Sequence, residues 1–176
     1  MHYSDIEDCD IANGPGVRVS IWVSGCGFHC PGCFNKEAWN PTHGKLFTKK
    51  TVDFIIESLK PKEISGLSIL GGEPLYFTNI RDVCSLCNKV KETYGDTKTI
   101  WLWTGNVWEN LVDLNVQYHF LENIDVIIDG QYDEKKRNLS LKYSGSENQR
   151  VIDVKRTLKE NHIVEINNYT MNKSKT

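Results

Sequence analysis

The chain lacks the features that mark exported proteins, membrane proteins and nucleic-acid-binding proteins. Its 176 residues carry 21 Lys and Arg against 23 Asp and Glu, a net charge of −2, so we expect no basic surface for nucleic acid or anionic lipid. No run approaches the roughly 18 consecutive apolar residues of a transmembrane helix, and the N-terminus has no charged-then-apolar signal pattern. We therefore expect a cytoplasmic protein that binds neither nucleic acid nor membrane.

The length suits one domain, and no internal repeat is visible. We expect a single domain over residues 1–166 and a flexible tail over residues 167–176, which are polar. The six cysteines belong to a chain without an export signal. In a reducing compartment, clustered thiols usually serve metal or redox chemistry rather than disulfides.

Three of the cysteines form the most informative motif of the chain. Cys26, Cys30 and Cys33 lie within eight residues, directly after the apolar run 19–23, and a Pro-Gly pair separates the last two. A regular helix is excluded there, so the backbone must curl and bring the three sulfurs toward one centre. Structural zinc sites and ordinary iron–sulfur clusters usually take four protein ligands. Three cysteines therefore favour a four-iron cluster that keeps one iron open for an outside ligand.

Two alternatives use the same residues. His29 could complete a zinc knuckle as a fourth ligand, which would make the chain a non-catalytic interaction module. A plain electron carrier would hold the cluster and bind nothing at the open iron.

Apolar strands and amphipathic helices alternate along the chain. We predict strands at residues 17–23, 67–70, 99–103 and 125–129, and helices that begin after Thr48, over residues 80–94 and over part of 107–122. Residues 151–159 suit either a strand or a helix. Such alternation predicts an α/β fold with parallel strands, and the chain is too short for the roughly 250 residues of a full (βα)₈ barrel. A partial, open barrel is the expected architecture.

The chemistry-bearing motifs each follow a predicted strand. The cysteine loop follows the first, Gly71-Gly-Glu-Pro74 the second, Thr104-Gly105 the third, and Asp129-Gly130 closes the fourth. Because the carboxyl ends of parallel strands share one edge, we expect these motifs to form a single site.

Six blocks of the sequence, in order, resemble one known family. Cys-x3-Cys-x2-Cys is the signature of the radical S-adenosylmethionine (SAM) enzymes, and the whole set resembles their branch of anaerobic ribonucleoside-triphosphate reductase-activating proteins. The blocks are Asp10-Ile-Ala-Asn-Gly-Pro-Gly16, the cysteine loop through Trp39, Gly71-Gly-Glu-Pro74, Trp101-Leu-Trp-Thr-Gly105, Asp125-Val-Ile-Ile-Asp-Gly130 and Gly145-Ser-Glu-Asn-Gln-Arg150.

The resemblance implies a partial radical SAM (βα) barrel and a defined chemistry. Cys26, Cys30 and Cys33 would hold a [4Fe-4S] cluster whose open iron binds SAM, and one electron would split SAM into methionine and a 5′-deoxyadenosyl radical. That radical would create a glycyl radical on the anaerobic (class III) reductase. A reduced flavodoxin-like protein would supply the electron. Activation of another glycyl radical enzyme, of the formate-lyase type, is the alternative within this class.

The resemblance also assigns SAM-binding residues. Gly71, Gly72 and Glu73 would meet the methionine part of SAM, and a carboxylate suits an ammonium group. Gly32 and Phe34 would lie near the adenine, although many radical SAM enzymes have an aromatic residue where this chain has Gly32. Asp129 is a further candidate, because a carboxylate at a strand end is costly to bury unless it is used.

The remaining conspicuous residues have structural interpretations. Cys84 and Cys87 fall on the apolar stripe of a helix and are expected to pack in the core, and Cys9 is isolated. Trp101 and Trp103 alternate in a strand and are expected in the core or a pocket wall. The polar segment 131–150, with Lys135, Lys136 and Arg137, is expected to contact a partner.

Overall fold

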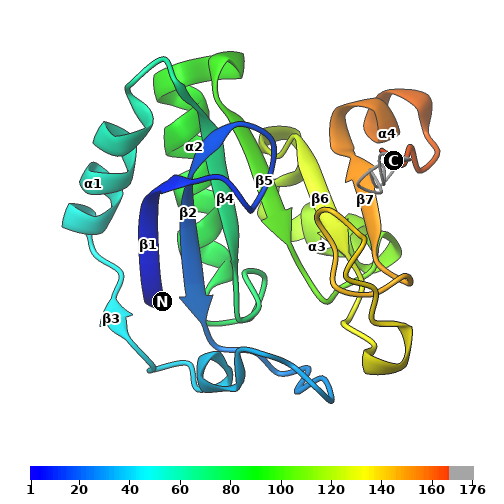
Figure 1. Cartoon of the computed structure of the whole chain (residues 1–176). Helices are drawn as coiled ribbons and strands as arrows, with labels where there is room; N and C mark the ends of the chain where they lie inside the picture. Colours follow the sequence, from blue (N-terminus) through cyan, green and yellow to red (C-terminus); the bar gives the residue numbers. More distant parts are fainter. Residues whose placement is uncertain (167–176) are drawn as a thin grey trace, which may run out of the picture.

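The computed structural model describes residues 1–166 and consists of one seven-stranded sheet with α-helices packed against it (Figure 1). The expected tail 167–176 lies outside the described residues. Within the described residues, no helix is long and apolar enough to cross a membrane. The strands run in the order β3-β1-β2-β4-β5-β6-β7. Their bounds are β1 His2–Asp10, β2 Val17–Ser24, β3 Lys45–Leu46, β4 Ile64–Gly71, β5 Thr99–Trp103, β6 Val126–Asp129 and β7 Arg150–Asp153.

The four central strands are parallel, as the sequence predicts. β2 pairs with β4, β4 with β5 and β5 with β6, and each pair has the parallel register. All four predicted strands are confirmed within a few residues. Their carboxyl ends therefore lie at one edge of the sheet.

The expectation of parallel strands is wrong at both margins of the sheet. β1 pairs antiparallel with β2, β3 with β1, and β7 with β6. β1 carries acidic residues and lacks apolar alternation, which suits a strand near a sheet edge. Because it lacks that alternation, hydrophobic periodicity does not predict this strand. The architecture is therefore a mixed α/β fold rather than an all-parallel one.

The predicted helices are present. α1 begins after Thr48, whose N–H donates to Thr51 Oγ1 at 3.1 Å, and α2 covers the predicted 80–94. The ambiguous stretch 151–159 contains both elements, because β7 ends at Asp153 and the carboxylate of this residue caps the next helix. The helices are α1 Lys49–Leu59, α2 Ile80–Tyr94, α3 Trp108–Tyr118 and α4 Val154–Glu160, with short 3₁₀ turns η1 Lys36–Trp39, η2 Gly95–Thr97, η3 Leu121–Asn123 and η4 Glu134–Lys136.

The two faces of the sheet have different environments. Side chains alternate along each strand, so one set faces α1, α2 and α3 and forms the main core, which contains Val19, Ile21, Ile69 and Leu102. Cys84 and Cys87 are buried in this core, as predicted.

The opposite face mixes polar and aromatic groups. Trp101 is buried in a second small cluster there, with Trp103 at its margin. The guanidinium of Arg18 lies 5.6 Å from the ring centroid of Trp101. Within residues 1–166, no helix covers this face of the central strands, and the cavity described below lies on it (Figure 1).

Arg18 organises the polar part of that face. Its side chain is fully buried and donates to Ser68 Oγ at 2.7 Å, to Thr99 Oγ1 at 3.0 Å, and to the carbonyls of Leu67 and Thr99 at 2.8 and 2.9 Å. Burial lowers the pKa of Arg18 to about 10, while the negative charges of Asp125 and Asp10 oppose that change. The residue therefore remains a cation at neutral pH.

We expect Arg18→Met to lower the free energy of unfolding by about 3 kcal/mol, because the buried carbonyls of Leu67 and Thr99 lose their donor. Arg18→Lys should recover little, since an ammonium cannot reproduce the planar set of bonds. Urea denaturation followed by circular dichroism measures both changes. Arg81→Met, at an exposed position of α2, is the matched control. An Arg18→Met protein as stable as this control would contradict the role given to Arg18.

Candidate iron–sulfur and cofactor site

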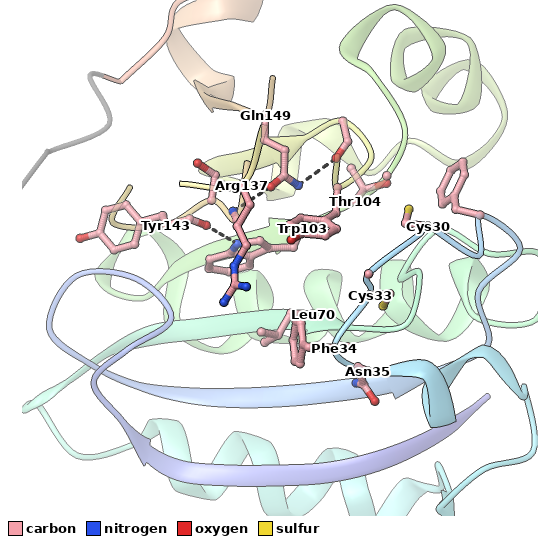
Figure 2. Close-up of a pocket in the computed structure, with 18 of the residues that line it drawn as sticks. Cys30, Cys33, Phe34, Asn35, Leu70, Trp103, Thr104, Arg137, Tyr143 and Gln149 are labelled. Carbon is pink, nitrogen blue, oxygen red and sulfur yellow. Dashed lines mark hydrogen bonds between the residues drawn. The ribbon is translucent and has the colours of Figure 1, made fainter. Parts of the chain in front are cut away.

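The ends of β2, β4, β5 and β6 and the loops after them surround one cavity of about 670 Å³. This volume falls within the range of about 300–1,000 Å³ that is usual for small-molecule sites. Figure 2 shows Cys30 and Cys33 on one side of the cavity and Arg137 and Tyr143 on the other. The predicted site residues that line it are Cys26, Cys30, Gly32, Cys33, Phe34, Gly71, Gly72, Glu73, Thr104 and Gly105.

The cysteine loop leaves β2, and its beginning is bonded to the 3₁₀ turn η1 that follows the loop. Gly25 N–H donates to the carbonyl of Ala38 at 2.7 Å, and Cys26 N–H donates to that of Trp39 at 3.3 Å. Further along, Cys33 N–H donates to the Cys30 carbonyl at 3.2 Å and closes a turn. All three cysteines are partly exposed and none forms a disulfide. The loop thus presents three free thiols to one cavity.

The surroundings of two of the thiols, Cys26 and Cys30, oppose their ionisation. Burial raises the pKa of Cys26, and the nearby Glu73 carboxylate adds to the rise. Burial also raises the pKa of Cys30. Metal binding must therefore displace protons from these thiols.

The donor set fits an iron–sulfur cluster better than a single zinc ion. Within residues 1–166, no three His, Cys, Asp or Glu side chains gather closely enough to hold one metal ion. The ring of His29 instead stacks on Trp39, with centroids 4.5 Å apart. Cysteines that each bind a different iron of a cluster lie farther apart than ligands of one ion. Three thiols on one cavity wall match that requirement.

Gly72 allows the ends of β2 and β4 to approach closely. A Cβ at this position would lie 2.6 Å from the carbonyl oxygen of Gly25 and 2.9 Å from that of Ala38. Gly72 N–H donates to the Val23 carbonyl at 2.7 Å, and Glu73 N–H donates to that of Gly25 at 2.8 Å. The Gly-Gly pair therefore joins the second motif to the base of the cysteine loop.

The Glu73 carboxylate is buried and already accepts three hydrogen bonds. Its Oε1 accepts from Leu75 N–H at 2.9 Å and from the Thr104 hydroxyl at 2.7 Å, and its Oε2 accepts from Gly105 N–H at 2.7 Å. Burial raises the pKa of Glu73, while these donors oppose the rise. The Asn106 side chain is a further hydrogen-bonding neighbour of this carboxylate. Glu73 thus connects the ends of β4 and β5.

The structure does not bring Asp129 to the cavity. Its carboxylate is buried, accepts from Trp108 N–H at 2.8 Å and pairs with Arg150 through both oxygens. The cost of burying this carboxylate was the reason for expecting a ligand contact at Asp129. Its bonds to Trp108 and Arg150 account for the buried charge without a ligand. Its neighbour Gly130 lines the cavity instead.

Gly32 and Phe34 lie beside the third cysteine at the cavity mouth. Gly32 has φ of +71°, where a side chain would be strained, and a Cβ there would lie 2.6 Å from the Glu134 carboxyl carbon. Phe34 lines the cavity although its side chain is 90% exposed.

One wall of the cavity was not predicted as part of the site. The segment 132–149 between β6 and β7 folds over the open face, with Arg137 and Tyr143 reaching toward the cavity (Figure 2). Trp103 Nε1–H donates to the Tyr143 carbonyl at 2.7 Å, and Gln149 Nε2–H donates to that of Gly130 at 2.9 Å. The expectation that Trp103 forms a pocket wall is confirmed. In the sequence, the polar block 145–150 is the feature that could have indicated that this segment belongs to the site.

Residues 12–152 match the family described as a 4Fe-4S single cluster domain. The match includes the cysteine loop and all four parallel strands. The cavity therefore belongs to an iron–sulfur cluster domain.

Curated relatives narrow this class. An anaerobic ribonucleoside-triphosphate reductase-activating protein of Enterobacteria phage T4 is 42% identical over 151 residues, which are 86% of this chain and 93% of the relative. Proteins of the same name from Vibrio cholerae (38% over 151 residues) and Escherichia coli K12 (39% over 153 residues) each match 85% of this chain and 96% of their own length. The chain belongs to the family of anaerobic ribonucleoside-triphosphate reductase-activating proteins, as its motifs indicated.

We expect Cys26→Ala, Cys30→Ala and Cys33→Ala each to weaken iron binding more than about tenfold, because each variant would remove one of the three expected ligands. Iron and sulfide bound per chain after anaerobic reconstitution measure the effect. Cys9→Ala is the matched control, since Cys9 is exposed and does not line the cavity. Equal iron content in Cys9→Ala and the three variants would contradict the assignment.

Proposed function

We propose that this chain is a radical SAM enzyme that activates an anaerobic ribonucleoside-triphosphate reductase. The observation that carries the proposal is one cavity that combines three cysteines on a loop with a Gly-Gly-Glu turn at the next strand end, in a chain of this family. The seven-stranded sheet, with its cavity on the face without helices, then corresponds to the partial, open radical SAM barrel.

The bound groups supply the chemistry. A cluster held by Cys26, Cys30 and Cys33 would supply one electron to SAM, which would yield methionine and a 5′-deoxyadenosyl radical able to take a hydrogen atom from a glycine of the reductase. We propose a reduced flavodoxin-like protein as the electron donor and the cytoplasm as the compartment, where thiols remain reduced.

The residues of the chain bind and align these groups. Cys26, Cys30 and Cys33 would ligate three irons and leave the fourth open toward the cavity. The backbone of Gly71 and Gly72 and the negative charge of Glu73 would receive the methionine ammonium group of SAM. Gly32 and Phe34 would lie against the adenine. Asp129, held by Arg150 and Trp108, would support this site from behind rather than contact SAM.

Access for a partner is supported by the exposed apolar residues at the cavity mouth. Phe34 is 90% exposed and Leu139 is 79% exposed, and both line the cavity. Large apolar side chains that remain this accessible at a functional opening suit contact with another protein. The segment 131–150 is the part of this chain that we propose to meet the reductase, with Leu139 and Arg137 at its tip.

The low-temperature EPR spectrum of the reduced, anaerobically reconstituted protein tests the cofactor assignment. We expect a four-iron signal whose shape changes when SAM is added, because SAM would bind the open iron directly. An unchanged signal would indicate an electron carrier, and the absence of any iron signal would indicate the zinc module.

The partner assignment has its own test. Incubation of the reduced protein with SAM and a class III ribonucleotide reductase should produce a glycyl radical signal on the reductase, and Cys30→Ala should abolish it. A signal that forms only when a formate-lyase-type enzyme replaces the reductase would overturn this assignment.

A further inference from the structure

The cysteine loop is held unevenly along its length. Among the described residues, the backbone bonds that join it to other segments occur at Gly25 and Cys26, which bond to η1 and, through the Gly25 carbonyl, to the end of β4. From residue 27 to residue 32, its contacts with the rest of the protein involve side chains. They include the stacking of His29 on Trp39 and the packing of Phe28 on Gly105. The position of Cys30 and Cys33 therefore depends on a few side-chain contacts.

The contact between Phe28 and Gly105 is close enough to exclude a side chain at residue 105. A Cβ built on Gly105 would lie 2.5 Å from both Cδ2 and Cε2 of the Phe28 ring. Phe28 stands between Cys26 and Cys30, and Gly105 follows the end of β5. The turn after β5 thus forms the surface on which the middle of the cysteine loop rests.

Glu73 fixes this turn. Its Oε2 accepts from Gly105 N–H, and its Oε1 accepts from the Thr104 hydroxyl and from Leu75 N–H. The Thr104 oxygen in turn accepts from the backbone N–H and the side-chain amide of Asn106, both at 3.1 Å. A single buried carboxylate therefore connects the end of β4 to the whole turn 104–106.

We propose that Glu73 is a positioning residue for the iron–sulfur cluster, which it acts on through Gly105 and Phe28 by holding the cysteine loop in place. This role rests on the proposed function, since it presumes that the three cysteines hold a cluster. It is distinct from a direct contact with SAM, because three of the four acceptor positions of the carboxylate are used inside the protein.

The replacement Glu73→Gln separates these roles. A carboxylate accepts at both oxygens, whereas an amide group donates at its nitrogen. In either orientation of the amide, its NH₂ group meets the N–H of Gly105 or that of Leu75. One backbone donor then loses its acceptor in a buried site, so the turn must shift away from Phe28.

The rate at which the reconstituted protein loses iron to a chelator measures how firmly the loop is held. We expect Glu73→Gln and Gly105→Ala each to lose iron about tenfold faster than the parent, because one breaks the turn and the other displaces the Phe28 ring. The reduced EPR signal of both variants should broaden in the same way. Far-UV circular dichroism shows whether Glu73→Gln is folded. If it is not, Gly105→Ala still tests the proposal.

Two further variants establish the route of the effect. Glu92→Gln removes an exposed carboxylate of α2 that does not line the cavity, and it should lose iron at the parent rate. Because Glu73 acts through Phe28, its effect and that of Phe28→Ala should not add in the double variant. Iron loss in Glu73→Gln no faster than in Glu92→Gln, or full additivity with Phe28→Ala, would overturn the proposal.

These measurements use neither SAM nor the reductase, so they do not depend on radical chemistry. A parent protein that binds no iron would instead contradict the proposed function. The alkylation rate of Cys30 in the metal-free variants would then decide the positioning role by itself, with faster alkylation in Glu73→Gln and Gly105→Ala expected and unchanged rates contradicting it.

Discussion

Two backbone hydrogen bonds between the ends of β2 and β4 determine how the site is assembled. Gly72 N–H bonds to the Val23 carbonyl and Glu73 N–H to the Gly25 carbonyl, and the missing side chain of Gly72 makes this approach possible. The cysteine loop begins at Gly25, and the carboxylate of Glu73 continues the connection to the turn after β5. Three strand ends are therefore held to one another before any cofactor binds.

The division of the sheet into two unlike faces makes room for the cavity. One face is covered by α1, α2 and α3 and is filled with aliphatic side chains. On the other, the buried Arg18 cation and the rings of Trp101 and Trp103 replace a packed helix layer. This face is stabilised by hydrogen bonds and aromatic contacts, so it can remain partly open and accept ligands without exposing the main core.

The sequence predicted the features whose signals are local. β5 is an apolar strand and was identified correctly. The spacing of Cys26, Cys30 and Cys33 indicated one loop, and all three line the same cavity. β1 was missed because its residues are polar and its stability comes from pairing with β2. The pairing of Asp129 with Arg150 could not be predicted because the two residues are distant in sequence. The wall formed by residues 132–149 likewise depends on a bond between Trp103 and Tyr143. Contacts between distant residues have no local pattern to reveal them.

The transfer of deuterium tests the central claim most directly, because it reports the hydrogen atom on which the proposed activity depends. A class III reductase labelled with deuterated glycine would be incubated with the reduced, cluster-loaded protein and SAM, and the 5′-deoxyadenosine product would be analysed by mass spectrometry. The account predicts one deuterium in the product for each glycyl radical formed. Unlabelled 5′-deoxyadenosine accompanied by a glycyl radical would contradict it, since the hydrogen atom would then have come from another position.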